Sequence, residues 1–161
     1  MTALAPVDTL VPQTVACAQA ERLVGTWRLV SFTQTILTTG ETIDVFGQAP
    51  QGFITYGTDR RMMVLMVKDT RPRPSDLASI TDEERADLFR TMVAYAGTYA
   101  FDGSVVTHHL DISWNQIFTD TDQVRNIEIN GCKLIMSTNP QPRSQDGRTA
   151  VSVLTWERLQ P

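Results

Sequence analysis

Two adjacent histidines, His108 and His109, are the side chains in this chain best suited to proton transfer near neutral pH. They lie in the stretch Ser104–Asn115, which alternates as a β-strand does and so places them on opposite faces. The neighbours of His108 on its own face are Val106, Leu110, Ile112 and Trp114. Apolar neighbours favour a neutral imidazole, so His108 is our candidate general acid or base. The alternative is a structural histidine that is hydrogen-bonded inside the protein.

The same alternation argues against a metal site. His108, His109 and Asp111 are suitable ligand types, but adjacent residues of a strand point in opposite directions and cannot chelate one ion. The sequence has no P-loop, no Gly-x-Gly-x-x-Gly fingerprint and no nucleophile elbow. We therefore expect no metal, no haem and no nucleotide cofactor.

Arg125 and Tyr56 complete the candidate catalytic group with His108. Arg125 shares a strand face with Ile127, and a buried guanidinium needs an anionic partner. That partner is either a carboxylate or enolate of a ligand, or an acidic side chain of the protein. The acidic candidates are Glu128, Glu157 and Asp111. Tyr56, at the end of the expected strand Gln51–Tyr56, would add a phenol to the same cavity.

Composition places the chain among ordinary globular proteins. The 161 residues suit one domain, and the formal charge of -4 argues against binding nucleic acid or an anionic membrane. Cys17 and Cys132 are too few for a disulfide framework, which favours a reducing, cytoplasmic location. The apolar run Val11–Ala20 has no Lys or Arg before it, which is untypical of a signal peptide. We expect a small uncharged or weakly ionised molecule as the partner.

Short turns divide the chain into a series of strands after a loose arm. We expect the arm over residues 1–21, with one helical turn near Gln13–Glu21, and a single domain over residues 22–161. The expected strands are Leu23–Leu37, Glu41–Phe46, Gln51–Tyr56, Arg60–Lys68, Thr98–Phe101, Ser104–Asn115, Gln123–Ile129, Cys132–Thr138 and Thr149–Leu159. Asp102-Gly103 and Asn130-Gly131 are favoured dipeptides for two-residue hairpin turns.

One helix interrupts the strands. Thr81 and Glu84 form a capping box, and apolar residues at helical spacing continue to a C-terminal cap at Gly97. The stretch Arg61–Val67 is apolar on both faces, which suits a strand between this packed helix and the protein interior. Tyr95 and Tyr99 flank the helix-to-strand junction, either at the mouth of a cavity or simply packed there.

Consecutive hairpins favour closure, because closure removes both exposed sheet edges. The sequence thus predicts an all-β fold: a closed antiparallel up-and-down β-barrel of eight to nine strands with one inserted α-helix. A barrel of this size holds one small ligand. The residues expected to line the ligand site are Phe53, Met63, Leu65, Val106, Leu110, Ile112, Trp114 and Ile127. A homodimer is compatible with this interpretation.

Several spaced motifs resemble one family. Gly25-Thr-Trp27 resembles the Gly-x-Trp signature of lipocalins, and Arg158 sits where the lipocalin arginine packs over that tryptophan. The longer stretches are Leu23–Phe32, Gln51–Tyr56, Ala94–Tyr99, Val106–His109 and Leu154–Arg158. Together they resemble the lipocalin-like domain family of bacteria and fungi over roughly residues 22–159. The resemblance implies a small β-barrel with a hydrophobic cavity, in a family that includes carriers and cofactor-free cyclases and isomerases.

Our hypothesis for function joins this cavity to the candidate side chains. A small, mostly apolar molecule would be bound and then isomerised or cyclised without a cofactor, as in natural-product biosynthesis. His108 would supply acid/base catalysis, with electrostatic help from Arg125 and Tyr56. The alternative is a carrier with the same cavity and no turnover. A third hypothesis, a domain that binds a protein partner, requires an exposed apolar patch.

Overall fold

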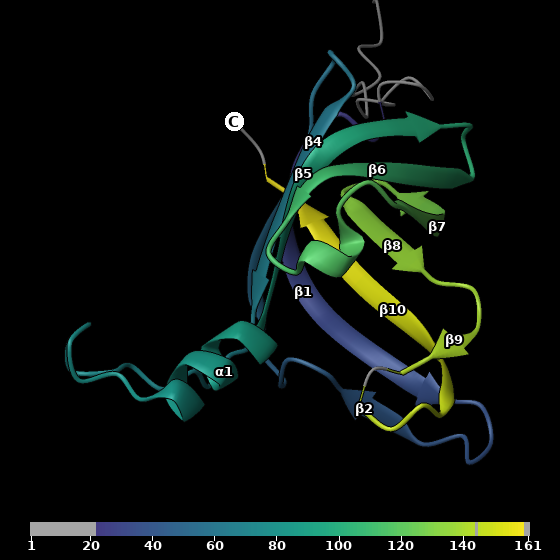
Figure 1. Ribbon diagram of the computed structural model, residues 1–161. Coiled ribbons are helices and arrows are strands. Elements are labelled where there is room, and N and C mark those ends of the chain that lie inside the picture. The colour runs from purple at the N-terminus through teal and green to yellow at the C-terminus, as the bar shows by residue number, and fades with distance from the viewer. Residues whose placement is uncertain (1–21, 144, 160–161) are drawn as a thin grey trace, which may run out of the picture.

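A computed structural model describes residues 22–143 and 145–159 of the chain (Figure 1). The strands are β1 (Gly25–Ile36), β2 (Thr42–Asp44), β3 (Gln51–Tyr56), β4 (Arg61–Val67), β5 (Met92–Phe101), β6 (Val105–Ser113), β7 (Asp122–Asn130), β8 (Lys133–Ser137), β9 (Gln141–Pro142) and β10 (Thr149–Arg158). The helices are α1 (Asp82–Arg90) and a 3-10 turn, η1 (Gln116–Phe118). The expected arm over residues 1–21 lies outside the described residues.

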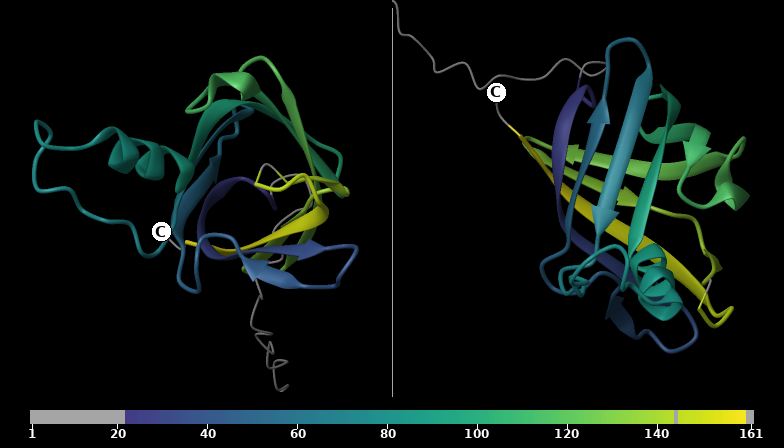
Figure 2. Two further views of the ribbon diagram at one scale, coloured as in Figure 1. Left: turned by 60° about the horizontal axis from the view of Figure 1, so that its bottom comes forward. Right: turned by 60° about the vertical axis from the view of Figure 1, so that its left-hand side comes forward.

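Eight antiparallel strands close into a barrel. The strand order is β1-β3-β4-β5-β6-β7-β8-β10, and β10 pairs back onto β1 from Trp27 opposite Arg158 to Ile36 opposite Ala150. The short strand β2 pairs with the end of β1, and the short strand β9 pairs with the start of β10. Figure 2 shows the resulting ring of strands. The predicted closed up-and-down barrel is confirmed, with each strand of the ring paired to its neighbours.

A tryptophan and an arginine seal one end of the barrel. Trp27 is fully buried, and its indole nitrogen donates to Leu23 O at 2.9 Å. The Arg158 guanidinium lies over the indole ring, 4.1 Å from its centroid, and donates to the backbone carbonyls of Val24 and Arg22. The guanidinium therefore donates hydrogen bonds to backbone carbonyls just before β1 while it stacks on an aromatic face. This is the packing that the resemblance implied for Arg158.

The inserted helix is shorter than predicted. The capping box of Thr81 and Glu84 is present, but α1 ends at Arg90 and Met92 begins strand β5. Gly97, expected as a helix cap, lies inside β5, where an added Cβ would come within 1.9 Å of the His109 carbonyl oxygen. The glycine is required because the backbone of β6 passes close to it. The prediction of a helix through Ala96 was wrong.

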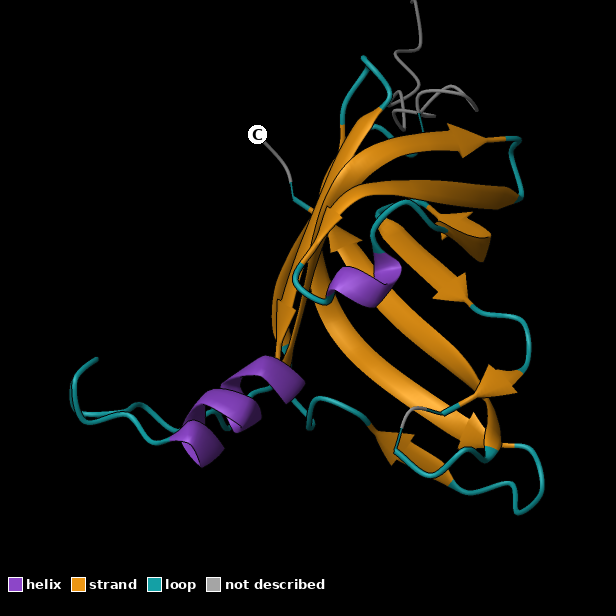
Figure 3. Cartoon of the chain, in the orientation of Figure 1, coloured by secondary structure: helices purple, strands orange, loops and turns teal. Residues whose placement is uncertain are grey.

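The helix also leaves the outer face of β4 uncovered. No residue of α1 is buried, and α1 extends away from the barrel in Figure 3. Three residues that we expected to line the ligand site point outward: Phe53 on β3, and Met63 and Leu65 on β4, have exposed fractions of 49%, 62% and 47%. The inward residues of β4 are Met62, Val64 and Met66. Both faces of β4 are apolar, so alternation defined the two sets without saying which one faces inward.

A β-bulge turns Ile112 outward as well. Gly97 pairs with Leu110 and Ala96 pairs with Ile112, so Asp111 is an extra residue between the two pairs. Ile112 is 66% exposed, whereas Leu110 is buried. Strict alternation assigned both residues to one face, and that prediction was wrong for Ile112.

None of the helices within residues 22–143 and 145–159 combines the length and apolar character needed to cross a membrane.

Candidate functional site

A cavity of about 330 Å³ lies among the inward side chains of the barrel. Its apolar wall includes Ile54, Val64, Met66, Val93, Leu110, Met136 and Leu154. Its polar wall includes Gln34, Tyr95, His108, Gln123, Arg125 and Arg143. Several strands therefore contribute to one space whose wall combines an apolar part with a cluster of polar groups, as small-molecule sites do.

His108 lies on the cavity wall between two phenols. It is buried on β6, and its Nε2 lies 2.7 Å from the hydroxyl of Tyr56 on β3. Its Nδ1 lies 3.2 Å from the hydroxyl of Tyr95 on β5. Tyr56 is itself buried, whereas Tyr95 lines the cavity. The three side chains form a chain of hydrogen bonds from the core to the cavity.

The hydrogen bonds indicate which nitrogen of His108 carries the proton. The buried Tyr56 hydroxyl must donate its hydrogen, and His108 Nε2 is the acceptor that the described residues provide. Nε2 is then unprotonated, so the proton is on Nδ1 and is donated to the Tyr95 oxygen. This assignment leaves the hydroxyl hydrogen of Tyr95 able to point into the cavity.

Burial keeps all three groups neutral. Loss of hydration, reinforced by the Arg125 charge, lowers the pKa of His108 to about 3. Burial also raises the pKa of Tyr56 well above its usual value and raises the pKa of Tyr95. For both phenols the Arg125 guanidinium opposes this rise, because a positive charge favours phenolate. Near neutral pH the site therefore presents a neutral imidazole and two un-ionised phenols.

Arg125 brings a positive charge to the same wall. It follows Gln123 on the inward face of β7, and its Nη2 donates to Gln123 Oε1 at 3.3 Å while Nη1 donates to Val124 O at 2.8 Å. Within the described residues it makes no ion pair with a carboxylate. The three acidic residues that sequence reasoning offered as its partners bind elsewhere, and the protein-based alternative for Arg125 is therefore not realised.

Each of those acidic residues has another partner. Asp111 pairs with Arg61 at 2.5 Å, and Glu157 pairs with Arg28 at 2.6 Å, both on the exposed surface. Glu128 accepts from the side chain of Asn130 at 2.7 Å.

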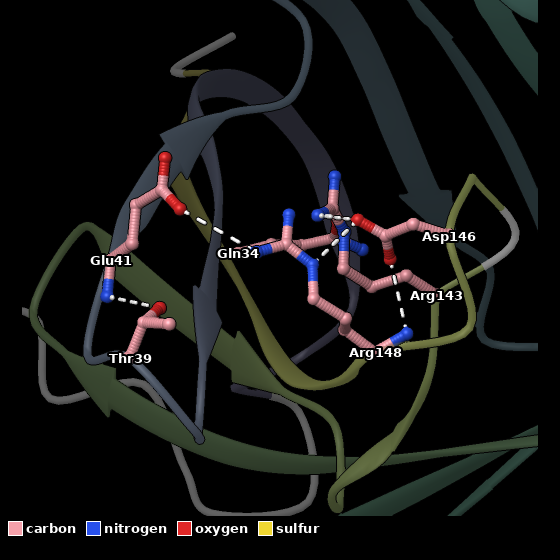
Figure 4. A network of polar contacts seen from close by, with 6 residues as sticks. All are labelled: Gln34, Thr39, Glu41, Arg143, Asp146 and Arg148. Carbon is pink, nitrogen blue, oxygen red and sulfur yellow. Dashed lines mark hydrogen bonds and ion pairs between the residues drawn. The ribbon is translucent and has the colours of Figure 1, made fainter.

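A second arginine of the wall, Arg143, is neutralised. Its guanidinium pairs with Asp146 at 2.9 Å and donates to Gln34 Oε1 at 3.1 Å (Figure 4). Asp146 also binds Arg148, which lies 3.7 Å from Glu41. This network links β1, the β9–β10 connection and the loop before β2, so it braces the end of the barrel opposite Trp27.

Two tryptophans of the cavity wall have indole nitrogens without a hydrogen-bond acceptor in the described part of the chain. The indole nitrogens of Trp114 and Trp156 are buried and lack a partner within the described residues. Both tryptophans line the cavity. Other atoms of these side chains line the cavity, since the indole nitrogens themselves have almost no accessible surface.

The structure brings together some of the predicted site residues and separates others. His108, Arg125, Leu110 and Trp114 line the cavity, and Tyr56 binds His108 from behind the wall. Val106 is fully buried and Ile127 packs against the core, so both lie inward but outside the cavity lining. Phe53, Met63, Leu65 and Ile112 face outward, as described above.

Sequence reasoning left Tyr95 open between the mouth of a cavity and simple packing, and it did not assign Gln34, Gln123 or Arg143 to the wall. Gln123 had a usable signal, because it alternates with Arg125 on one face of β7. Tyr95 was assigned to the helix end, which concealed its place on a strand. Gln34 and Arg143 carry no local signal, since they meet through the pairing of β1 with β10.

Within the described part of the chain, no group of three His, Cys, Asp or Glu side chains is arranged to hold a metal ion.

The family model described as a lipocalin-like domain matches residues 24–159, which is most of the chain. No curated protein matches the chain.

Proposed function

We propose that this chain, which belongs to the lipocalin-like domain family, binds a small, mostly apolar molecule in its cavity and catalyses a cofactor-independent isomerisation or cyclisation of it. A lipocalin-like barrel suits the binding of a small hydrophobic ligand. The observation that carries the catalytic part is the Tyr56–His108–Tyr95 chain of hydrogen bonds at the wall of an apolar cavity, next to Arg125.

Tyr95 is the group of this chain that would meet the substrate. Its hydroxyl hydrogen would be donated to a carbonyl oxygen, where negative charge develops as an enol forms or a ring closes. As that proton moves, the Tyr95 oxygen becomes phenolate, which His108 Nδ1–H and the nearby Arg125 charge stabilise. The phenolate would then take the proton that the substrate releases from its α-carbon or from the hydroxyl group that closes the ring, which restores Tyr95 and leaves an enol. Tyr95 would next protonate carbon and take back the enol O–H proton, so the product carbonyl is restored and the protein ends unchanged.

His108 and Tyr56 would act mainly by fixing this geometry. Tyr56 donates to Nε2 and thereby holds the proton on Nδ1, the side that faces Tyr95. The imidazole stays neutral because burial disfavours its charged form. A neutral His108 can then donate to an incipient phenolate without first losing or gaining a proton.

The apolar wall would supply the rest of the catalysis. Ile54, Val64 and Leu110 come from three different strands and enclose one space. A flexible substrate confined there would be held near its reactive conformer and kept from water. The alternative function, a carrier without turnover, uses the same cavity and differs in giving the polar groups only a binding role.

A mass spectrometry experiment tests occupancy of the cavity. Small molecules that co-purify with the protein would be extracted and compared between the wild type and a Leu110→Trp variant, in which a large side chain fills the cavity. Leu65→Trp, on the exposed outer face of β4, is the matched control. We expect one compound with the wild type and the control but not with Leu110→Trp. Equal recovery from all three proteins would refute binding in this cavity.

A further inference from the structure

We propose that the ligand is an organic acid bound as its anion, with the charged oxygens on the Arg125 guanidinium and the apolar remainder in the barrel. This inference rests on the proposed function only in assuming that the cavity binds a small molecule. It names the chemical class of that molecule.

The first support is the uncompensated charge of Arg125. The half-buried guanidinium has five N–H groups, and the structure shows two of its nitrogens bound, to Val124 O and Gln123 Oε1. Both acceptors are neutral, and no carboxylate of the described residues reaches Arg125. A half-buried guanidinium beside a cavity, with no counterion from the described part of the protein, is an available partner for an anion. A carboxylate is the natural complement, because it matches the planar fork of a guanidinium.

The second support is the contrast with Arg143 on the same wall. Arg143 is nearly buried, and the protein supplies its counterion through Asp146 at 2.9 Å. The chain therefore neutralises one arginine of the cavity and leaves the other without an anionic partner. The difference places the site for a ligand anion at Arg125 and not at the braced end of the barrel.

The third support is the hydrogen-bonding chemistry of the guanidinium itself. A guanidinium can donate hydrogen bonds but cannot accept them. Because two of the nitrogens of Arg125 bind neutral oxygens of the protein, its remaining N–H groups call for a ligand with acceptor oxygens.

The position of Arg125 would hold the anion close to the proposed reaction centre. Arg125 is paired with Val106, and Gln123 is paired with His108. Arg125 and His108 are therefore on adjacent strands, at pairs two residues apart. Its charge acts on the pKa values of His108, Tyr56 and Tyr95. An acid bound there would present the neighbouring part of its skeleton to the Tyr95 hydroxyl.

Calorimetric titration with two matched probes tests the inference. Octanoate and octanamide have the same alkyl chain and differ in charge at the head. At pH 7 we expect the wild type to bind octanoate at least about tenfold more tightly than octanamide, since charge-assisted hydrogen bonds are the strong ones. In Arg125→Met this preference should fall to about onefold, while the affinity for octanamide changes little.

Arg28→Met is the charge-matched control. It removes one positive charge from the exposed outer surface, where Arg28 pairs with Glu157. The control should keep the tenfold preference, which excludes an effect of net charge. Arg125→Lys keeps the charge but loses the planar fork, so it should retain part of the preference and serves if Arg125→Met does not fold.

Three results would overturn the inference: similar affinities of the wild type for both probes, binding of neither, or a preference that survives in Arg125→Met. Failure of the catalytic proposal would look different. In that case His108→Ala would leave turnover unchanged, while the Arg125-dependent preference for octanoate would persist.

Discussion

Replacing Tyr56 by phenylalanine tests the hydrogen-bond chain at the centre of the site. The change removes one oxygen and leaves His108 Nε2 buried without its donor at 2.7 Å. An unsatisfied buried acceptor costs about 1–3 kcal/mol of unfolding free energy. For a chain of this size each kcal/mol lowers Tm by about 2–4 °C, so Tyr56→Phe should melt about 2–12 °C below the wild type.

The same variant should change the protonation of His108. Without the Tyr56 donor nothing fixes the proton on Nδ1, so nitrogen-15 NMR should show the Nδ1–H form in the wild type and a mixture of both forms in Tyr56→Phe. Tyr99→Phe is the matched control, because it also removes a buried phenol that donates a hydrogen bond, in this case to Gly57 O at 2.8 Å. It should lower Tm without changing the His108 spectrum.

Two results would refute this reasoning. One is a wild-type spectrum in which the proton is on Nε2. Tyr56 would then accept that hydrogen bond, and its own hydroxyl hydrogen would have no acceptor among the described residues. The other is a Tyr56→Phe protein whose unfolding free energy and His108 spectrum both equal those of the wild type.

Three further predictions concern stability. Trp27→Ala should lower the unfolding free energy by about 3–5 kcal/mol in urea titration, and an unchanged value would argue against the Trp27–Arg158 seal. Gly97→Ala should cost at least about 2 kcal/mol, because its Cβ would meet the His109 carbonyl at 1.9 Å, whereas Gly40→Ala has open space and should cost about 1 kcal/mol. Because the pKa of His108 is about 3 when folded and near 6.5 when unfolded, the unfolded chain binds more protons between these values; stability should rise with pH there, by at most about 1.4 kcal/mol per pH unit. His108→Gln should flatten this slope. His109→Gln should not, because Asp122 raises the pKa of the exposed His109 in the folded protein, so this histidine affects stability at higher pH.

The closed barrel could be predicted from local signals. Hairpin dipeptides and alternation set the strand order, and the Trp27 and Arg158 motifs marked the first and last strands. The error lay between them, at Met92–Gly97. Val93, Tyr95 and Gly97 alternate as in a strand, but the same stretch also places apolar residues at helical spacing after a true capping box. Pairing of β5 with both β4 and β6 resolves this ambiguity, and such pairing is not local.

The candidate site was predictable only in part, for a similar reason. His108 stood out because alternation put an imidazole among apolar residues, and it does lie on the cavity wall. Met63 and Leu65 were assigned to the wrong face, since the outward face of β4 is as apolar as the inward one. Ile112 was misplaced by a bulge that depends on Gly97 in a neighbouring strand. When both faces of a strand are apolar, its orientation depends on how it packs against the rest of the protein. The sequence of the strand alone does not contain that information.

The most direct test of the account is the turnover rate of His108→Ala with the compound that co-purifies with the wild type. We predict that turnover falls by about 10²–10⁴-fold while the affinity for that compound stays within about tenfold of the wild type. A folded His108→Ala protein that converts the compound at the wild-type rate would contradict the proposed role of His108.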